Sequence, residues 1–118
     1  MAFPSRVQGA GQSGGAALAI CGQVDNAITA AGSVAADATQ VNNTYVRVST
    51  AASGTGIKLP AVEAGAMMVV RNDGAQTLTV YPQTGTTING TASDSIVAGK
   101  ANLFFGTSTT TWVSLDGA

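Results

Sequence analysis

Side chains that could do chemistry are few in this sequence. The chain contains no histidine and one cysteine, Cys21. Without histidine there is no Ser-His-Asp triad and no histidine-activated cysteine nucleophile. A single cysteine also makes a zinc site unexpected and leaves no disulfide framework within the chain. We therefore expect Cys21 to behave as a small buried apolar residue, as free cysteines commonly do.

The carboxylates are the remaining candidates for acid–base chemistry, and they are spread singly along the chain: Asp25, Asp37, Glu63, Asp73, Asp94 and Asp116. A glycosidase needs two carboxylates facing one another, and Glu63 with Asp94 is the pair that the sequence leaves open. Both lie in turn-like contexts, and Asp73 is explained by the turn Asp73-Gly74. The N-terminal glycines do not follow a strand and open a helix, so they do not form a phosphate-binding loop. We expect no enzyme, no metal site and no cofactor.

Charge is scarce. Charged residues make up 9% of the 118 residues and the net charge is −1, against about 25% charged residues in an average soluble protein. The five cations are scattered, which predicts no nucleic-acid partner. No apolar run approaches the ~18 residues of a membrane helix, so no membrane partner is expected. Because a free monomer normally carries more surface charge, the composition favours a protein that works in an assembly.

Strand signals fill the chain from Thr44 onward. Turn signals recur about every 8–12 residues there, which is typical of a sandwich or barrel. We expect an all-β fold, a compact antiparallel β-sandwich or barrel of about 7–8 short strands. Residues 21–118 would form the single β-domain, with regular strands mainly in 44–116. A hairpin at Asp73-Gly74 would join 67–72 to 77–81, and 102–105 would pair with 111–115.

The chain before Thr44 divides into two segments of different composition. Residues 1–20 are rich in Gly, Ala, Ser and Gln, which describes an extended N-terminal arm. Residues 21–43 have widely spaced apolar residues, and we expect a loop with a short turn or strand, a helix over 34–41 being the alternative.

Alternation along the strands predicts which residues are buried. It places Leu78 and Val80 on one face, and groups Leu103 with Phe105, or Val113 with Leu115, in the same way. Four large residues do not follow this alternation: Met67, Val69, Phe104 and Trp112. Either the strands are buried on both sides or an outer face meets another subunit. The candidate subunit interface is therefore Met67, Val69, Arg71, Phe104 and Trp112.

Two of the side chains have alternative interpretations. Arg71 could be a surface cation that lays its stem along apolar neighbours, or it could pair with a carboxylate such as Glu63 or Asp94 in a subunit contact. Trp112 and Tyr81 could form a sugar-stacking platform, although core and interface packing is the more general role of such aromatics.

The longest run of strand signals has a recognisable order. TGIKLPAVEAGAMMVVRNDGAQTLTVYPQTGTTING (55–90), followed by VAGKANLFFGTSTTTWVSL (97–115), resembles small virion proteins of tailed bacteriophages. The shared features are a strand ending in Leu-Pro, a Val-Val-Arg-Asn strand, a strand ending in Tyr-Pro, a Gly-Thr-Ile-Asn-Gly segment and a final Thr-x-Trp strand. The resemblance covers residues 45–115, and none of its features is a catalytic signature.

The resemblance implies a capsid decoration, or cement, protein. Such a protein would be made in the cytoplasm of a host bacterium, sit on the virion surface and bind the major capsid protein, usually as a homotrimer. The arm would be the capsid-binding part, with Phe3, Pro4, Arg6 and Val7 as candidate contacts. The alternative is a tail or head-fibre knob module, with or without glycan binding for host attachment.

Overall fold

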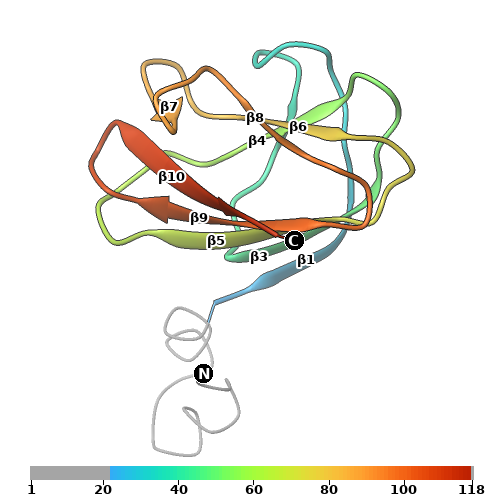
Figure 1. The fold of residues 1–118 in the computed structure, drawn as a ribbon, viewed down its shortest axis with the longest axis horizontal. Coiled ribbons are helices and arrows are strands. Elements are labelled where there is room, and N and C mark those ends of the chain that lie inside the picture. The colour runs from blue at the N-terminus through green and yellow to red at the C-terminus, as the bar shows by residue number, and fades with distance from the viewer. Residues whose placement is uncertain (1–21, 118) are drawn as a thin grey trace, which may run out of the picture.

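The computed structural model describes residues 22–117, which form ten short strands in two facing layers (Figure 1). A six-stranded sheet has the order β1-β3-β5-β9-β10-β7, and a four-stranded sheet has the order β2-β4-β6-β8. The strands are β1 (Val24–Thr29), β2 (Thr39–Gln40), β3 (Tyr45–Thr50), β4 (Gly56–Lys58), β5 (Met67–Asn72), β6 (Leu78–Tyr81), β7 (Thr87–Ile88), β8 (Asp94–Ile96), β9 (Ala101–Gly106) and β10 (Thr111–Asp116). The predicted all-β class is confirmed, and the predicted arm, residues 1–20, lies outside the described residues.

The arrangement of the strands differs from the predicted antiparallel sandwich or barrel. From β1 to β6 the chain alternates between the two sheets, and β1-β3-β5 and β2-β4-β6 pair in parallel. Val24, Tyr45 and Val69 stack at intervals of roughly 20 residues, the lower end of the range for stacked repeats. The first half of the fold is therefore a short β-solenoid. Strands β8, β9 and β10 then close it with antiparallel pairs.

The expected hairpin at Asp73-Gly74 is also wrong. Strand β5 lies in the six-stranded sheet and β6 in the four-stranded sheet, so the turn is a corner between layers. The corner sits tightly on the preceding coil, because a Cβ on Gly74 would lie 2.5 Å from the backbone nitrogen of Ala51. By contrast, the predicted pairing of 102–105 with 111–115 is confirmed by β9 and β10.

Asn72 holds this corner together from inside. Its side chain is fully buried. Its Nδ2 donates to the carbonyl oxygens of Gln76 (2.8 Å) and Ile96 (2.9 Å), and its Oδ1 accepts from the backbone nitrogen of Gly74 (2.9 Å). Because a buried amide is costly without partners, this bonding explains how a polar residue can be fully buried at the end of β5.

The segment before Thr44 contains two strands. The prediction of a loop with a short turn or strand is confirmed in part: β1 is six residues long and β2 is two. The alternative helix over 34–41 does not form, because this segment makes a turn, with the nitrogen of Asp37 donating to the carbonyl of Val34, and then enters β2. Val41, 1% exposed, is the main contribution of this segment to the core.

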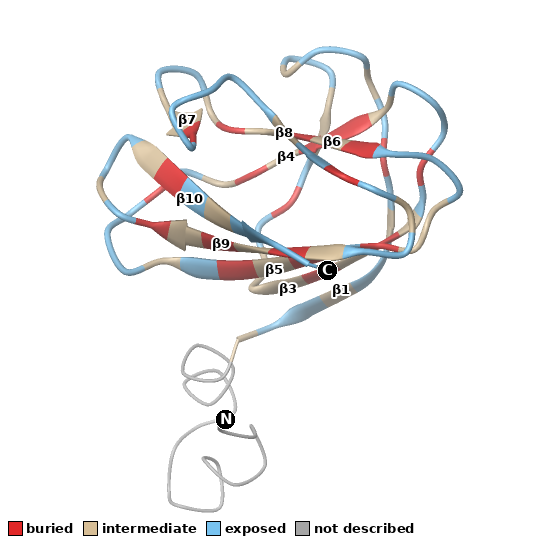
Figure 2. Cartoon of the chain, viewed as in Figure 1, coloured by how far each residue is buried: buried red, intermediate tan, exposed pale blue. Residues whose placement is uncertain are grey.

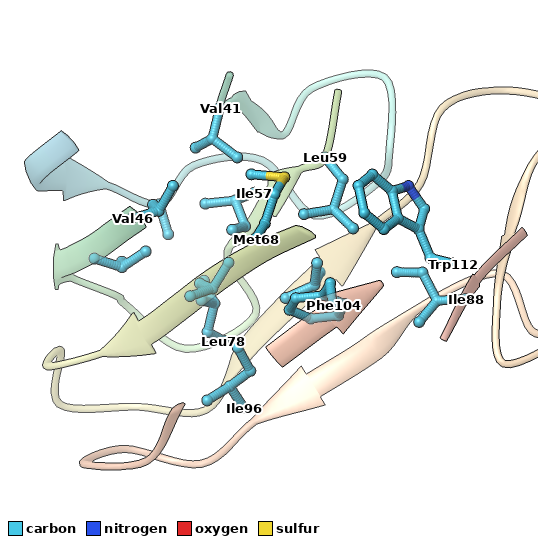
Figure 3. Packing of buried hydrophobic residues seen from close by; sticks show 14 of the residues in the cluster. Val41, Val46, Ile57, Leu59, Met68, Leu78, Ile88, Ile96, Phe104 and Trp112 are labelled. Atoms are coloured by element: carbon cyan, nitrogen blue, oxygen red, sulfur yellow. The ribbon is translucent and has the colours of Figure 1, made fainter. Parts of the chain in front are cut away.

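The core fills the space between the two layers (Figures 2 and 3). Leu78 and Val80 are fully buried, as predicted. Phe104 and Trp112 are buried as well, with 0% and 1% exposure, so their predicted position on an outer face is wrong. The inward residues of β9 are Asn102, Phe104 and Gly106, which leaves Leu103 and Phe105 on the other side of the sheet. None of the described segments is a helix long and apolar enough to cross a membrane.

Candidate interaction surface

The side of the six-stranded sheet that faces away from the core is apolar over most of its area. Register aligns its side chains in rows across the strands. We call this surface the outer face. Its first row is Met67, Phe105 and Val113; its second row is Tyr45, Val69, Leu103 and Leu115; its third row is Arg47, Arg71 and Ala101.

Several residues of the outer face are open to solvent. Leu115 is 58% exposed and Met67 47%, while Phe105, Val69 and Leu103 are half-buried beside them. Val24, paired with Tyr45 at the edge of the second row, is 61% exposed. A continuous exposed apolar surface of this kind marks an interaction site, whereas single exposed apolar residues do not.

The opposite side of the molecule is different. On the four-stranded sheet, the residues that alternate with the core positions are Lys58, Thr79, Tyr81 and Ser95. The Tyr81 hydroxyl donates to the carbonyl oxygen of Ser33 (3.1 Å). Of the two sheets in residues 22–117, it is the six-stranded one that presents an apolar outward face.

A charged cluster occupies the third row of the outer face. Arg47 and Arg71 lie side by side on β3 and β5, an arrangement that repels unless an anion lies between them. Asp73 supplies the anion: its carboxylate accepts from the Nε of Arg47 (2.7 Å) and the Nε of Arg71 (2.6 Å). These hydrogen bonds, that of Arg47 first, hold the pKa of the Asp73 carboxyl below its ordinary value of 3.8.

The partner of Arg71 within the chain is thus Asp73, two residues further on, and not Glu63 or Asp94. Arg71 remains half exposed, with 52% of its side chain open to solvent. Among the described residues, its two terminal nitrogens have no hydrogen-bond partner, whereas Arg47 also donates from Nη1 to the carbonyl of Asn26 (2.9 Å). Arg71 therefore keeps donors free for a further contact at the border of the outer face.

The edges of the six-stranded sheet are less suited to docking than its face. Strand β1 has register shifts at Asp25, Ile28 and Thr29, and such irregularities twist an edge away from strand addition. On β10, the Asn89 side chain accepts from the Ser114 backbone nitrogen (3.0 Å) and donates to the Ser114 hydroxyl (2.8 Å). Asn89 thereby occupies part of the edge that the two-residue strand β7 leaves uncovered.

The carboxylate pair that sequence left open is not assembled. The carbonyl oxygen of Glu63 lies against Gly106, at one end of β9, whereas the Asp94 carboxylate accepts from the Nδ2 of Asn102 (3.2 Å), near the other end. The Asn102 Nδ2 also donates to Asp116 (2.9 Å). In the described part of the chain, no group of three or more His, Cys, Asp or Glu residues could hold a metal ion.

The proposed sugar platform is not formed either. Trp112 is buried and cannot present its ring to a ligand. Its Nε1 has no hydrogen-bond partner among residues 22–117, which is a cost to folding and not a surface contact. Trp112 pairs with Ile88 across β10 and β7, and Figure 3 shows its ring within the core cluster.

Of the five predicted interface residues, Met67, Val69 and Arg71 lie on the outer face, while Phe104 and Trp112 lie in the core. Sequence reasoning assigned the opposite side to Leu103, Phe105, Val113 and Leu115. The missing information was the pairing of β5 with β9, which sets Met67 opposite Phe105 and Val69 opposite Leu103, because cross-strand partners share a face. The four arm candidates, Phe3, Pro4, Arg6 and Val7, lie outside the described residues.

Comparisons of this chain with protein-family models, with curated proteins and with solved structures each found no significant match.

Proposed function

We propose that this chain is a structural virion protein that decorates a phage capsid and stabilises it by binding the major capsid protein. The observation that carries the proposal is the outer face: an exposed apolar surface on one side of a small β-scaffold whose other sheet is polar. The resemblance of residues 45–115 to small phage virion proteins is the basis for naming the major capsid protein as the partner.

The two parts of the chain would have separate tasks. The arm, residues 1–20, would contact the capsid surface, since Gly and Ala let a backbone approach another surface closely. The β-domain would contact its own copies through the outer face. Many weak contacts across a lattice add up to firm attachment. Stabilisation then follows by mass action, because the protein binds the assembled shell and not its dissociated subunits.

Co-sedimentation with capsids that lack the protein tests this function. We expect saturable binding and a higher temperature of capsid disruption. Deletion of residues 2–17 should abolish binding while the fluorescence of Trp112 still reports a folded β-domain. Unchanged binding by the deletion variant would refute the arm's role. Binding to host polysaccharide without binding to capsids would refute the decoration function.

One observation favours the second candidate, a tail or head-fibre knob module. Strands β1 and β2 form the first coil of the solenoid, and both are edge strands of their sheets. Coils of a solenoid stack along one direction, so a further coil of a fibre could stack at the β2 edge, although the register shifts of β1 oppose pairing on that side. Cryo-electron microscopy of the virion separates the two functions by the position and copy number of the protein.

A further inference from the structure

Glycine follows an Asn or Asp residue at three places in the sequence: Asp73-Gly74, Asn89-Gly90 and Asp116-Gly117. Such pairs can rearrange covalently, because a glycine nitrogen that no side chain hinders can attack the carbonyl carbon of the preceding side chain. The Gly74 nitrogen donates to the Oδ1 of Asn72 (2.9 Å) and the Gly117 nitrogen to the carbonyl of Ala101 (2.8 Å). The Gly90 nitrogen has no hydrogen-bond partner within residues 22–117, and Asn89 and Gly90 are both exposed.

We propose that Asn89 is a site of spontaneous deamidation, in which the Gly90 nitrogen closes a succinimide ring on the Asn89 side chain. The nitrogen loses its proton to solvent and forms a bond to the Asn89 Cγ. The bond between Cγ and Nδ2 breaks, and Nδ2 takes up a proton and leaves as ammonia. Water then adds to one of the two ring carbonyl carbons, which gives aspartate or isoaspartate at position 89. The reaction is a substitution followed by a hydrolysis, so its reactants are the chain itself and water.

The folded turn holds the reacting atoms apart. Asn89 and Gly90 have positive φ values of 54° and 77°, and Ile88 and Thr91 exchange two backbone hydrogen bonds across them (3.0 and 2.9 Å). These are the features of a type I′ turn, in which ψ of the first central residue is about +30°. At that angle the Gly90 nitrogen points away from the Asn89 Cβ, whereas ring closure needs the two side by side. The reaction therefore requires a rotation about the Cα–C bond of Asn89 that breaks the turn.

Hydrogen bonds to β10 restrain the same residue. The Asn89 Oδ1 accepts from the Ser114 backbone nitrogen (3.0 Å), and its Nδ2 donates to the Ser114 hydroxyl (2.8 Å). The Asn89 backbone nitrogen also donates to the carbonyl of Trp112 (2.8 Å). Deamidation is thus limited to moments when the turn and the two-residue strand β7 leave β10. Such an opening is local, because a short exposed element opens more readily than the core.

The two products differ in their effect on this edge of the sheet. Aspartate keeps the length of the backbone, and its carboxylate can accept from both the nitrogen and the hydroxyl of Ser114. Isoaspartate carries the side-chain carbon into the main chain, so Ile88 and Thr91 no longer face each other across a two-residue turn. Formation of isoaspartate would therefore leave the β10 edge uncovered beside Ser114, and an uncovered edge is open to strand addition.

Incubation of the full chain at mildly alkaline pH, native and in urea, tests the site. Peptide mass spectrometry follows the loss of the carboxamide at each Asn, and enzymatic methylation detects isoaspartate. In urea we expect Asn89 to react faster than every other Asn, and in the native protein at least about tenfold more slowly than in urea, since the turn is open only part of the time. Equal rates in the two states, or a faster reaction at another Asn in either state, would overturn the proposal.

Two serine variants test the restraint by β10. Ser114→Ala removes one of the two side-chain bonds of Asn89 and should speed the native reaction about fivefold, the effect of one hydrogen bond. Ser95→Ala is the matched control, because Ser95 is an exposed strand residue of the other sheet, and it should leave the rate unchanged. Urea unfolding shows that both variants are folded, and equal rates for the two would refute the role of Ser114.

The succinimide route has a test that needs no folded protein. Gly90→Ala places a methyl group beside the attacking nitrogen and should slow deamidation of Asn89 in urea several-fold, while the rates at the other Asn residues stay the same. An unchanged rate at Asn89 would mean that the Gly90 nitrogen is not the nucleophile. None of these results depends on whether the protein binds capsids.

Discussion

Removing the Asn72 side chain should strongly destabilise the protein at the corner between the layers. In Asn72→Ala, the carbonyl oxygen of Ile96 loses its side-chain donor within the core, and the Gln76 carbonyl and Gly74 nitrogen lose theirs at the partly exposed turn. A net loss of about 1 kcal/mol for each hydrogen bond, and more where a group stays buried and unpaired, gives a total of about 3–4 kcal/mol. Domains of this size are stable by about 5–15 kcal/mol, so the variant should fold with a much reduced margin.

Urea unfolding followed by the fluorescence of Trp112 measures this loss directly. Trp112 is the single tryptophan and is buried, so its emission reports the folded core. With a slope near 2 kcal/mol/M, the midpoint should fall by about 1.5–2 M. Asn26→Ala removes the same side chain from an exposed position on β1, and should change stability by less than about 0.5 kcal/mol. If the two variants lose equal stability, Asn72 does not hold the corner as we describe.

Two further predictions test the position of side chains around the sheet. Phe104→Ala should cost about 3–5 kcal/mol of unfolding free energy. Phe105→Ala, on the outer face, should cost less than about 1 kcal/mol and should instead weaken self-association. Equal losses of the two variants in urea unfolding would contradict the register of β9. Asp73→Asn should destabilise the protein at neutral pH, because the folded-state pKa of Asp73 lies below 3.8 and its carboxylate stabilises the fold above that value. The difference between wild type and Asp73→Asn should stay constant from pH 7 to pH 5 and shrink as the pH falls below about 4; a difference that grows in acid would contradict the assignment.

Much of the strand content could be predicted from sequence, because turn residues and β-branched runs are local signals. The segments 45–49, 67–72, 102–105 and 111–115 all correspond to strands. What local signals cannot give is the sheet to which each strand belongs. Asp73-Gly74 fits a two-residue hairpin and equally fits a corner, and the decision rests on Asn72 bonding to Ile96, 24 residues away. Parallel coils are built from such distant contacts, so they leave little trace in a short window.

The side of the sheet on which Phe104 and Phe105 lie shows a second limit. Leu103, Phe104 and Phe105 form an unbroken apolar run, and a period of two assigns no face to a run without polar members. Two neighbours decide it. Gly106 faces inward, where the Glu63 carbonyl leaves no room for a side chain, and Asn102 points inward to reach Asp94 and Asp116. Since residues two apart share a face, Phe104 follows them into the core.

The structure shows on which surface the charged residues are missing. A composition of 9% charged residues suggests a surface covered by neighbours, but it does not say where. The four-stranded sheet is polar on its outward side, through Lys58, Thr79 and Ser95, as a solvated surface normally is. The uncharged area is concentrated in the first two rows of the outer face, and the Arg47–Asp73–Arg71 cluster lies in its third row. An apolar face with a charged cluster along one border suits a surface that docks in a defined orientation, because apolar contact supplies attraction and the flanking charges restrict the direction of the partner.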